Sequence, residues 1–381
     1  MTNWNINERI PLLKALFKKQ VATDTNSSES KIDFVEFQQY HNDSLTEEQQ
    51  LTFSTTDFCK TADNSIDENK RFRYPIFHKG DGTKSDECII LLHGLNERSW
   101  DKYLPWGDYL ANHTGKSVIL FPIAFHINRT PTSWHSPRSI MEWVLQRNSR
   151  LGNPKNLTFA NLALSDRLSK APQRFYTSGR ETAHNIVQLM NEIQSGEHPY
   201  FNANAKIDFF AYSIGALLAQ VLFLSNPNSL FSNTRLFMFC GGSIFNQMNG
   251  NSRYIMDETS FQQMLEYYQN DFLSQAADPN DSFDRAFRSM IDKTEDRAYR
   301  ENCFALASDR IKVIALEKDT VIPASGIRDA LGEICANTCL TVLDFPFDYS
   351  HETPFPAGKN APPEVNQMFN QVFSAAGDFL A

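Results

Sequence analysis

Short apolar runs alternate with longer amphipathic segments from about residue 72 to the C-terminus. The apolar runs are Cys88–Leu92, Val118–Phe121, Ile207–Tyr212, Leu236–Cys240, Ile311–Leu316 and Leu340–Leu343. Because these runs are apolar almost throughout, they predict strands that are buried on both faces. Such strands, separated by helices, predict a mostly parallel, doubly wound sheet of the α/β class.

Local signals predict the ends of further elements. Phe72–His78 predicts an edge strand that ends at the glycine-containing turn 79–82. Ser99 is the expected N-cap of a helix that stops before Gly115. Ser178 and Glu181 have the spacing of a capping box, which predicts that a helix starts there.

Three parts of the chain do not fit this alternation. Residues 127–177 and 243–310 are too long for simple crossovers, so we expect helical insertions that form a lid over an active site. Residues 1–71 form an N-terminal extension, which is either a helical cap or the early strands of the sheet. We therefore expect one domain over residues 72–381, preceded by this extension.

Composition excludes some classes of protein. The chain has 381 residues and a net charge of −9, whereas a nucleic-acid-binding protein needs a basic face. No uninterrupted apolar run reaches the ~18 residues that span a bilayer, and the N-terminus lacks the pattern of a signal peptide. The six cysteines do not resemble a disulfide framework. We expect a cytoplasmic protein without a transmembrane segment, and its oligomeric state is left open.

The segment from Ala211 to Gly215 carries the sharpest chemical signal. Ser213 lies at its centre, directly after an apolar strand and directly before an apolar helix. A serine on such a tight turn projects from the end of the sheet in a strained conformation. The backbone amide of Ile214, at the start of the helix, can then face a developing negative charge. Ser213 is therefore the candidate nucleophile.

A serine nucleophile needs a base and an orienting carboxylate. His351 is the only histidine downstream of Ser213, and it follows the last predicted strand. Asp319 follows the strand that ends at Leu316, and its rivals are Glu317, Asp344 and Asp348. Because the carboxyl ends of parallel strands meet at one edge, we expect Ser213, Asp319 and His351 to lie together.

A second amide for an oxyanion is expected from the loop that follows Cys88–Leu92. His93 should hold this loop, and Gly94 should let it bend so that the amide of Leu95 faces the substrate. Asn96 is the alternative donor. The other histidines, His126, His135 and His184, are expected to be packed or solvated rather than to form a metal site.

These motifs together make residues 72–376 resemble the α/β-hydrolase superfamily. The oxyanion loop corresponds to His93-Gly94, the nucleophile turn to 211–215, the acid to Asp319 and the base to His351, while Ala211 replaces the usual first glycine. The resemblance implies hydrolysis of an ester, thioester or amide through an acyl-serine, without a metal or organic cofactor. The unmatched extension and insertions point to an uncharacterised bacterial family within this superfamily.

We therefore expect a carboxylic ester hydrolase that acts on a small acyl substrate. One alternative is a non-catalytic binding protein on the same fold, since a fold alone does not establish a function. A binding protein has no need of Ser213, Asp319 and His351 at three strand ends. A peptidase or an acyltransferase with the same residues is a further alternative, although long insertions favour a covered site over an open mouth. No glycine-rich dinucleotide turn is present, which weighs against an oxidoreductase.

Overall fold

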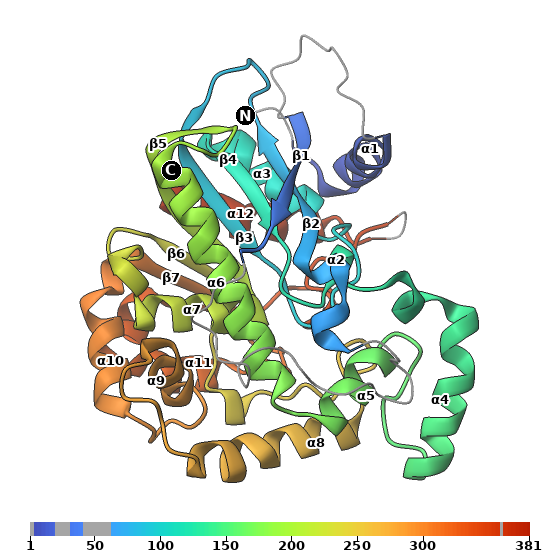
Figure 1. The fold of residues 1–381 in the computed structure, drawn as a ribbon. Helices are drawn as coiled ribbons and strands as arrows, with labels where there is room; N and C mark the ends of the chain where they lie inside the picture. Colours follow the sequence, from blue (N-terminus) through green and yellow to red (C-terminus); the bar gives the residue numbers. More distant parts are fainter. Residues whose placement is uncertain (1–3, 20–30, 41–61, 359–360) are drawn as a thin grey trace.

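The computed structural model describes residues 4–19, 31–40, 62–358 and 361–381. Its centre is an eight-stranded sheet with helices packed around it (Figure 1). The strand order is β1-β2-β4-β3-β5-β6-β7-β8. The strands are β1 (Lys31–Gln38), β2 (Arg71–His78), β3 (Ser85–Leu92), β4 (Ser117–Phe121), β5 (Phe201–Tyr212), β6 (Leu236–Phe239), β7 (Ile311–Leu316) and β8 (Leu340–Leu343). Strands β4, β3 and β5 to β8 are parallel, while β1 and β2 pair antiparallel.

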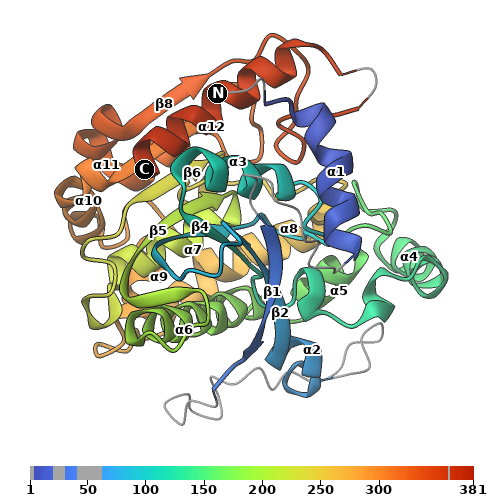
Figure 2. The ribbon, with the colours of Figure 1, turned by 90° about the horizontal axis from the view of Figure 1, so that it is seen from above.

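Helices cover both faces of the sheet, because successive residues of its buried strands point to opposite sides. Cys88, Ile90 and Leu92 of β3 pack with α6 (Arg174–Ser195), α7 (Ile214–Ser225) and α11 (Ala324–Cys339). Ile89 and Leu91 pack with α1 (Ile6–Lys19), α3 (Leu104–Thr114) and α12 (Glu364–Leu380). Figure 2 shows α6 on one side of the sheet and α3 with α12 on the other. The expected α/β class, a mostly parallel sheet with helices on both faces, is confirmed.

Two predictions about the edges of the sheet were wrong. β2 is not an edge strand, because β1 pairs along its whole length on one side and β4 pairs on the other. The ring of Phe37 in β1 packs against Phe72 and Phe121, so β1 belongs to the core although it lies in the expected extension. β8, expected to be buried, is the opposite edge strand, and its residues Thr341 and Val342 are exposed.

Two predicted helix starts also differ. α3 begins at Leu104 rather than after Ser99. α6 begins at Arg174, so Ser178 and Glu181 do not form a capping box. Instead, the Ser178 hydroxyl donates to the carbonyl of Phe175, and Glu181 forms an ion pair with Arg129. Tertiary contacts thus override the local capping signal.

The two insertions contain most of the remaining helices. The first insertion has α4 (Pro137–Leu151) and α5 (Leu162–Lys170), after the short helix α2 (Asp67–Lys70) of the extension. The second has α8 (Glu258–Glu266), a π-helical continuation (Tyr267–Phe272), α9 (Ser282–Ser289) and α10 (Arg297–Leu306). The remaining short 3-10 turns lie at 63–65, 127–129, 132–135, 227–229, 245–247 and 308–310. α5 packs on α8, so the insertions contact one another (Figure 1).

A buried ion pair joins the two insertions. Arg147 Nε of α4 donates to Asp257 Oδ2 over 2.7 Å, and the two side chains are 2% and 0% exposed. Asp257 also caps α8, because its Oδ1 accepts from the Ser260 amide over 2.9 Å. Removal of the arginine would leave a buried carboxylate without its counter-charge, which is far more costly than loss of an exposed pair.

We predict that Arg147→Met lowers the free energy of unfolding by about 3–5 kcal/mol. The matched control is Arg297→Met, since Arg297 pairs with Glu301 on an exposed helix face and should unfold at nearly the wild-type denaturant concentration. Urea unfolding followed by circular dichroism measures both variants. Equal unfolding midpoints for the two variants would contradict this account of the insertions.

Candidate active site

Ser213 occupies a strained turn between β5 and α7. Its φ of 55° and ψ of −123° lie outside the usual regions for a side-chain-bearing residue, and it is 4% exposed. The turn fits because Gly215 lets α7 approach β3: a Cβ on Gly215 would lie 2.7 Å from the His93 carbonyl oxygen. Gly241 is equally necessary, because a Cβ added at this position would lie 2.7 Å from the Ser213 carbonyl oxygen. Gly241 was not predicted, although the pair Gly241-Gly242 after β6 is a visible signal.

Ser213, His351 and Asp319 form one chain of hydrogen bonds. Ser213 Oγ lies 2.7 Å from His351 Nε2, and His351 Nδ1 lies 2.8 Å from Asp319 Oδ2. The other carboxylate oxygen of Asp319 accepts from the amides of Val321 and Ile322, each over 2.9 Å. Two amides therefore anchor Oδ1 and direct Oδ2 toward the imidazole. Because a carboxylate accepts, Nδ1 donates, which leaves the Nε2 lone pair facing the serine.

The rival carboxylates lie elsewhere. Asp344 accepts from the Tyr349 hydroxyl over 3.0 Å and pairs with Lys318 over 2.9 Å. Neither it nor Glu317 or Asp348 makes a hydrogen bond to His351 within the described residues. Asp319 is therefore the carboxylate that contacts the imidazole.

Tyr212 supports His351, a role that was not predicted. Its hydroxyl donates to the His351 carbonyl oxygen, and its ring stacks on the imidazole with centroids 5.4 Å apart and planes 15° apart. Burial keeps the pKa of Tyr212 well above its ordinary value, so the hydroxyl stays a donor. In the sequence this tyrosine occupies the variable position before the serine. The motif therefore did not indicate that Tyr212 contacts His351.

The loop after β3 lies against the nucleophile turn. His93 Nδ1 is 2.8 Å from the Gly94 carbonyl oxygen, and its Nε2 accepts from the Ile123 amide over 2.9 Å. Burial holds the pKa of His93 well below its ordinary value, so it is a neutral residue that ties two loops together. A Cβ on Gly94 would lie 3.1 Å from the Tyr212 ring and 3.3 Å from Ser213 Cβ. Gly94 thus permits close approach of the loop to the serine.

The candidate oxyanion amides belong to Leu95 and Ile214, which follow Gly94 and Ser213 in the chain. The Gly94 amide is occupied, because it donates to the Tyr103 hydroxyl over 2.9 Å. No hydrogen bond leads from the Leu95 or Ile214 amide to another described residue. Leu95 and Ile214 both line one small cavity, whereas Asn96 does not. The Asn96 side chain instead donates to backbone carbonyls of both insertions.

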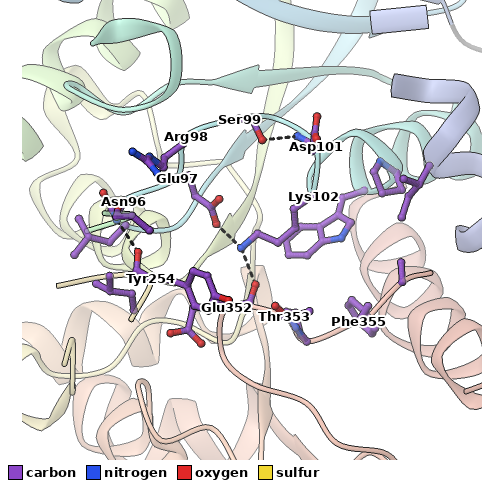
Figure 3. A pocket seen from close by; sticks show the side chains of 18 of the residues that line it. Asn96, Glu97, Arg98, Ser99, Asp101, Lys102, Tyr254, Glu352, Thr353 and Phe355 are labelled. Carbon is purple, nitrogen blue, oxygen red and sulfur yellow. Dashed lines mark hydrogen bonds and ion pairs between the residues drawn. The ribbon is translucent and has the colours of Figure 1, made fainter. Parts of the chain in front are cut away.

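Cavities border the loop on several sides. The largest of them, here the Lys102 cavity, has a volume of about 430 Å³ and lies between α1, the loop 95–99 and the loop that follows His351. Figure 3 shows Lys102 in it, bridging the Glu97 carboxylate and the Glu352 carbonyl oxygen. Of two smaller cavities, each of about 50 Å³ and each lined in part by His126, the one with mostly apolar walls that include Leu217 and Phe287 is here called the His126 cavity. The loop thus lies between a charged cavity and an apolar cavity, and neither is lined by Ser213 or His351 itself.

No cluster of three or more His, Cys, Asp or Glu side chains among the described residues is arranged to hold a metal ion. No described helix is long and apolar enough to cross a membrane.

Several solved structures resemble this fold at low sequence identity. Carboxyl esterase 2 from the fungus Tuber melanosporum shares 8% identity over 97% of this chain and 96% of its own, with a TM-score of 0.46. A bacterial heroin esterase shares 11% identity over 98% and 92%, with a TM-score of 0.46. A candidate dipeptidyl aminopeptidase IV from Bacteroides ovatus shares 12% identity, with a TM-score of 0.43. This chain covers 36% of that protein's length, and 92% of this chain is matched.

A search of curated proteins found no match to this chain. One family of sequences, described as a family of unknown function and designated DUF6051, matches residues 5–381. The match includes the strained serine turn, the loop after β3 and both insertions. The chain therefore belongs to the DUF6051 family.

Proposed function

We propose that this protein is a serine hydrolase that cleaves a carboxylic ester through an acyl-serine intermediate. The observation that carries the proposal is the hydrogen-bonded chain of Ser213, His351 and Asp319 on a strained turn. A serine hydroxyl is a weak nucleophile on its own, and this arrangement supplies the base and the group that orients it. A protein that only binds a ligand gains nothing from such a chain.

The proposed reaction has two halves. Ser213 Oγ attacks the carbonyl carbon of the ester while His351 Nε2 takes the hydroxyl proton, and the amides of Ile214 and Leu95 stabilise the oxyanion. The tetrahedral intermediate then collapses, the ester C–O bond breaks, and His351 gives its proton to the departing alkoxide. Water next attacks the acyl-serine with His351 as base, which releases the carboxylic acid and restores Ser213.

The two cavities support a division of the substrate. The apolar His126 cavity, of about 50 Å³, shares Leu95 and Ile214 with the proposed oxyanion site and suits a short acyl group. The charged Lys102 cavity, of about 430 Å³, suits a larger and more polar alcohol. Thioesters and amides can use the same groups, but a carboxylic ester is the substrate class that we propose.

We predict that a fluorophosphonate probe labels the wild-type protein once and does not label Ser213→Ala, because only an activated serine reacts with it. Ser225→Ala is the matched control, since Ser225 ends α7 and its hydroxyl donates only to the Leu222 carbonyl. It should be labelled like the wild type. Intact mass spectrometry measures the adduct. Equal labelling of the wild type and Ser213→Ala would refute the assignment of the nucleophile.

We also predict that Asp319→Asn lowers kcat for a short ester by about 10⁴-fold, because an amide can no longer fix the tautomer of His351. Asp344→Asn is the control, since Asp344 pairs with Lys318 and makes no contact with the imidazole. Its kcat should stay close to that of the wild type. Steady-state kinetics with a chromogenic ester measures both. A large loss in Asp344→Asn with little loss in Asp319→Asn would show that the acid has been misassigned.

A further inference from the structure

One buried histidine near the site has a ring nitrogen without a partner. His126 follows β4, is 6% exposed and lines the His126 cavity together with Leu95 and Ile214. Its Nδ1 lies 2.9 Å from the Ala124 carbonyl oxygen, whereas its Nε2 has no hydrogen-bond partner among the described residues. Burying an unsatisfied polar atom is unfavourable, so the arrangement requires an explanation.

The contacts of His126 fix what its free nitrogen can do. A carbonyl oxygen only accepts, so Nδ1 carries the hydrogen and Nε2 presents a lone pair. Burial lowers the pKa of His126 to about 4, so the ring is neutral near pH 7. Nε2 is therefore a hydrogen-bond acceptor and not a proton donor at neutral pH.

The backbone that presents His126 is strained on both sides. Phe125 has a φ of 61° and Ile127 a φ of 53°, which is rare for a side-chain-bearing residue and most unfavourable for a β-branched one. The surroundings hold this conformation: Asn69 accepts from the Phe125 amide over 3.1 Å and also from Arg129. Fully buried Arg129 also pairs with Glu181. Strain that is held this firmly is typical of functional positions.

The rest of the cavity offers no other group of this kind. Ser178 is the other polar side chain among the described residues that line it, and its hydroxyl already donates to the Phe175 carbonyl. The remaining lining side chains of this cavity are apolar. His126 also lines a neighbouring cavity of about 50 Å³, together with polar side chains such as Thr130, His135 and Arg167. Among the described residues that line either cavity, His126 Nε2 is the one buried side-chain acceptor without a partner. A donor on the ligand would satisfy it.

We propose that His126 is a specificity-determining residue that accepts a hydrogen bond from a hydroxyl or N–H group on the acyl part of the substrate. The inference rests on the proposed function and adds the substrate class: short acyl groups that carry a hydrogen-bond donor. The cavity of about 50 Å³ limits their size, since each water-sized group needs about 10–15 Å³. An acyl group that lacks the donor leaves Nε2 unsatisfied and binds less well.

The test compares matched p-nitrophenyl esters: butanoate with 3-hydroxybutanoate, and propanoate with 2-hydroxypropanoate. We expect the wild type to favour at least one hydroxylated ester by about tenfold or more in kcat/KM. His126→Phe should abolish the preference, mainly through a higher KM for the hydroxylated ester. His126→Gln keeps an acceptor oxygen at similar reach and should restore part of it. His184→Phe is the control, because His184 lies on α6, does not line the cavity and should retain the preference.

Titration calorimetry with the four free carboxylates supplies a readout that needs no turnover. The hydroxylated acids should bind the wild type more tightly than their parents, and His126→Phe should remove the difference. Equal affinities in the wild type, or a preference that survives in His126→Phe, would overturn the inference. If the acids bind with the expected preference but no ester is hydrolysed and Ser213 takes no label, the proposed function fails while the recognition role stands. Melting curves of each variant check that it is folded.

Discussion

Close backbone contact between the start of α7 and the end of β3 is the constraint on which the site depends. At Gly215 the helix comes so near the strand that a Cβ would lie 2.7 Å from the His93 oxygen. This approach brings the Ser213 turn beside the loop after β3. Gly241 allows an equally close approach to the Ser213 backbone, and Gly94 leaves room for the Tyr212 ring. Substitution of Gly215 or Gly241 by a residue with a side chain would force the backbones apart, because the added Cβ would lie less than 3.0 Å from backbone atoms. The strained backbone conformation of Ser213 persists because the closely packed neighbouring residues leave no room for another conformation.

Histidines in and around this contact have different roles, which their surroundings determine. His93 has both ring nitrogens occupied by backbone groups, so it can only join two loops. His351 contacts a carboxylate on one nitrogen and a serine on the other. His126 has one nitrogen fixed by a carbonyl and the other directed to no described residue. Histidine thus has three roles here: His93 joins two loops, His351 is the proposed base and His126 is the proposed recognition group.

Part of this structure could be predicted from the sequence because parallel strands buried on both faces leave an unmistakable apolar pattern. The runs at Cys88–Leu92 and Ile311–Leu316 lie within strands of the sheet. For the extension the sequence left a helical cap and early strands as alternatives, because residues 31–38 of β1 mix charged and apolar positions, as an edge strand does. The boundaries 1–71 and 72–381 stay predictions, and parts of the extension lie outside the described residues.

The residues of the candidate site could likewise be predicted only in part. Ser213, Asp319 and His351 were recognisable because each follows a strand, and strand ends are readable in the sequence. The supporting groups were not, since the contact of Tyr212 with His351 and that of Gly241 with Ser213 join residues distant in the chain. His126 was expected to be merely packed or solvated. Its distinguishing features are the positive φ angles on both sides and the missing partner, and neither leaves a trace in residue types.

The central claim is that Ser213 becomes acylated during turnover. The most direct measurement is an acid quench of the wild-type protein while it hydrolyses a short ester, followed by intact mass and peptide mapping. The account predicts a mass increase equal to one acyl group, located on the peptide that contains Ser213. Ester hydrolysis that places the acyl group on another residue would contradict it. So would ester hydrolysis in which no acyl-enzyme is found at any quench time, even when deacylation is slowed.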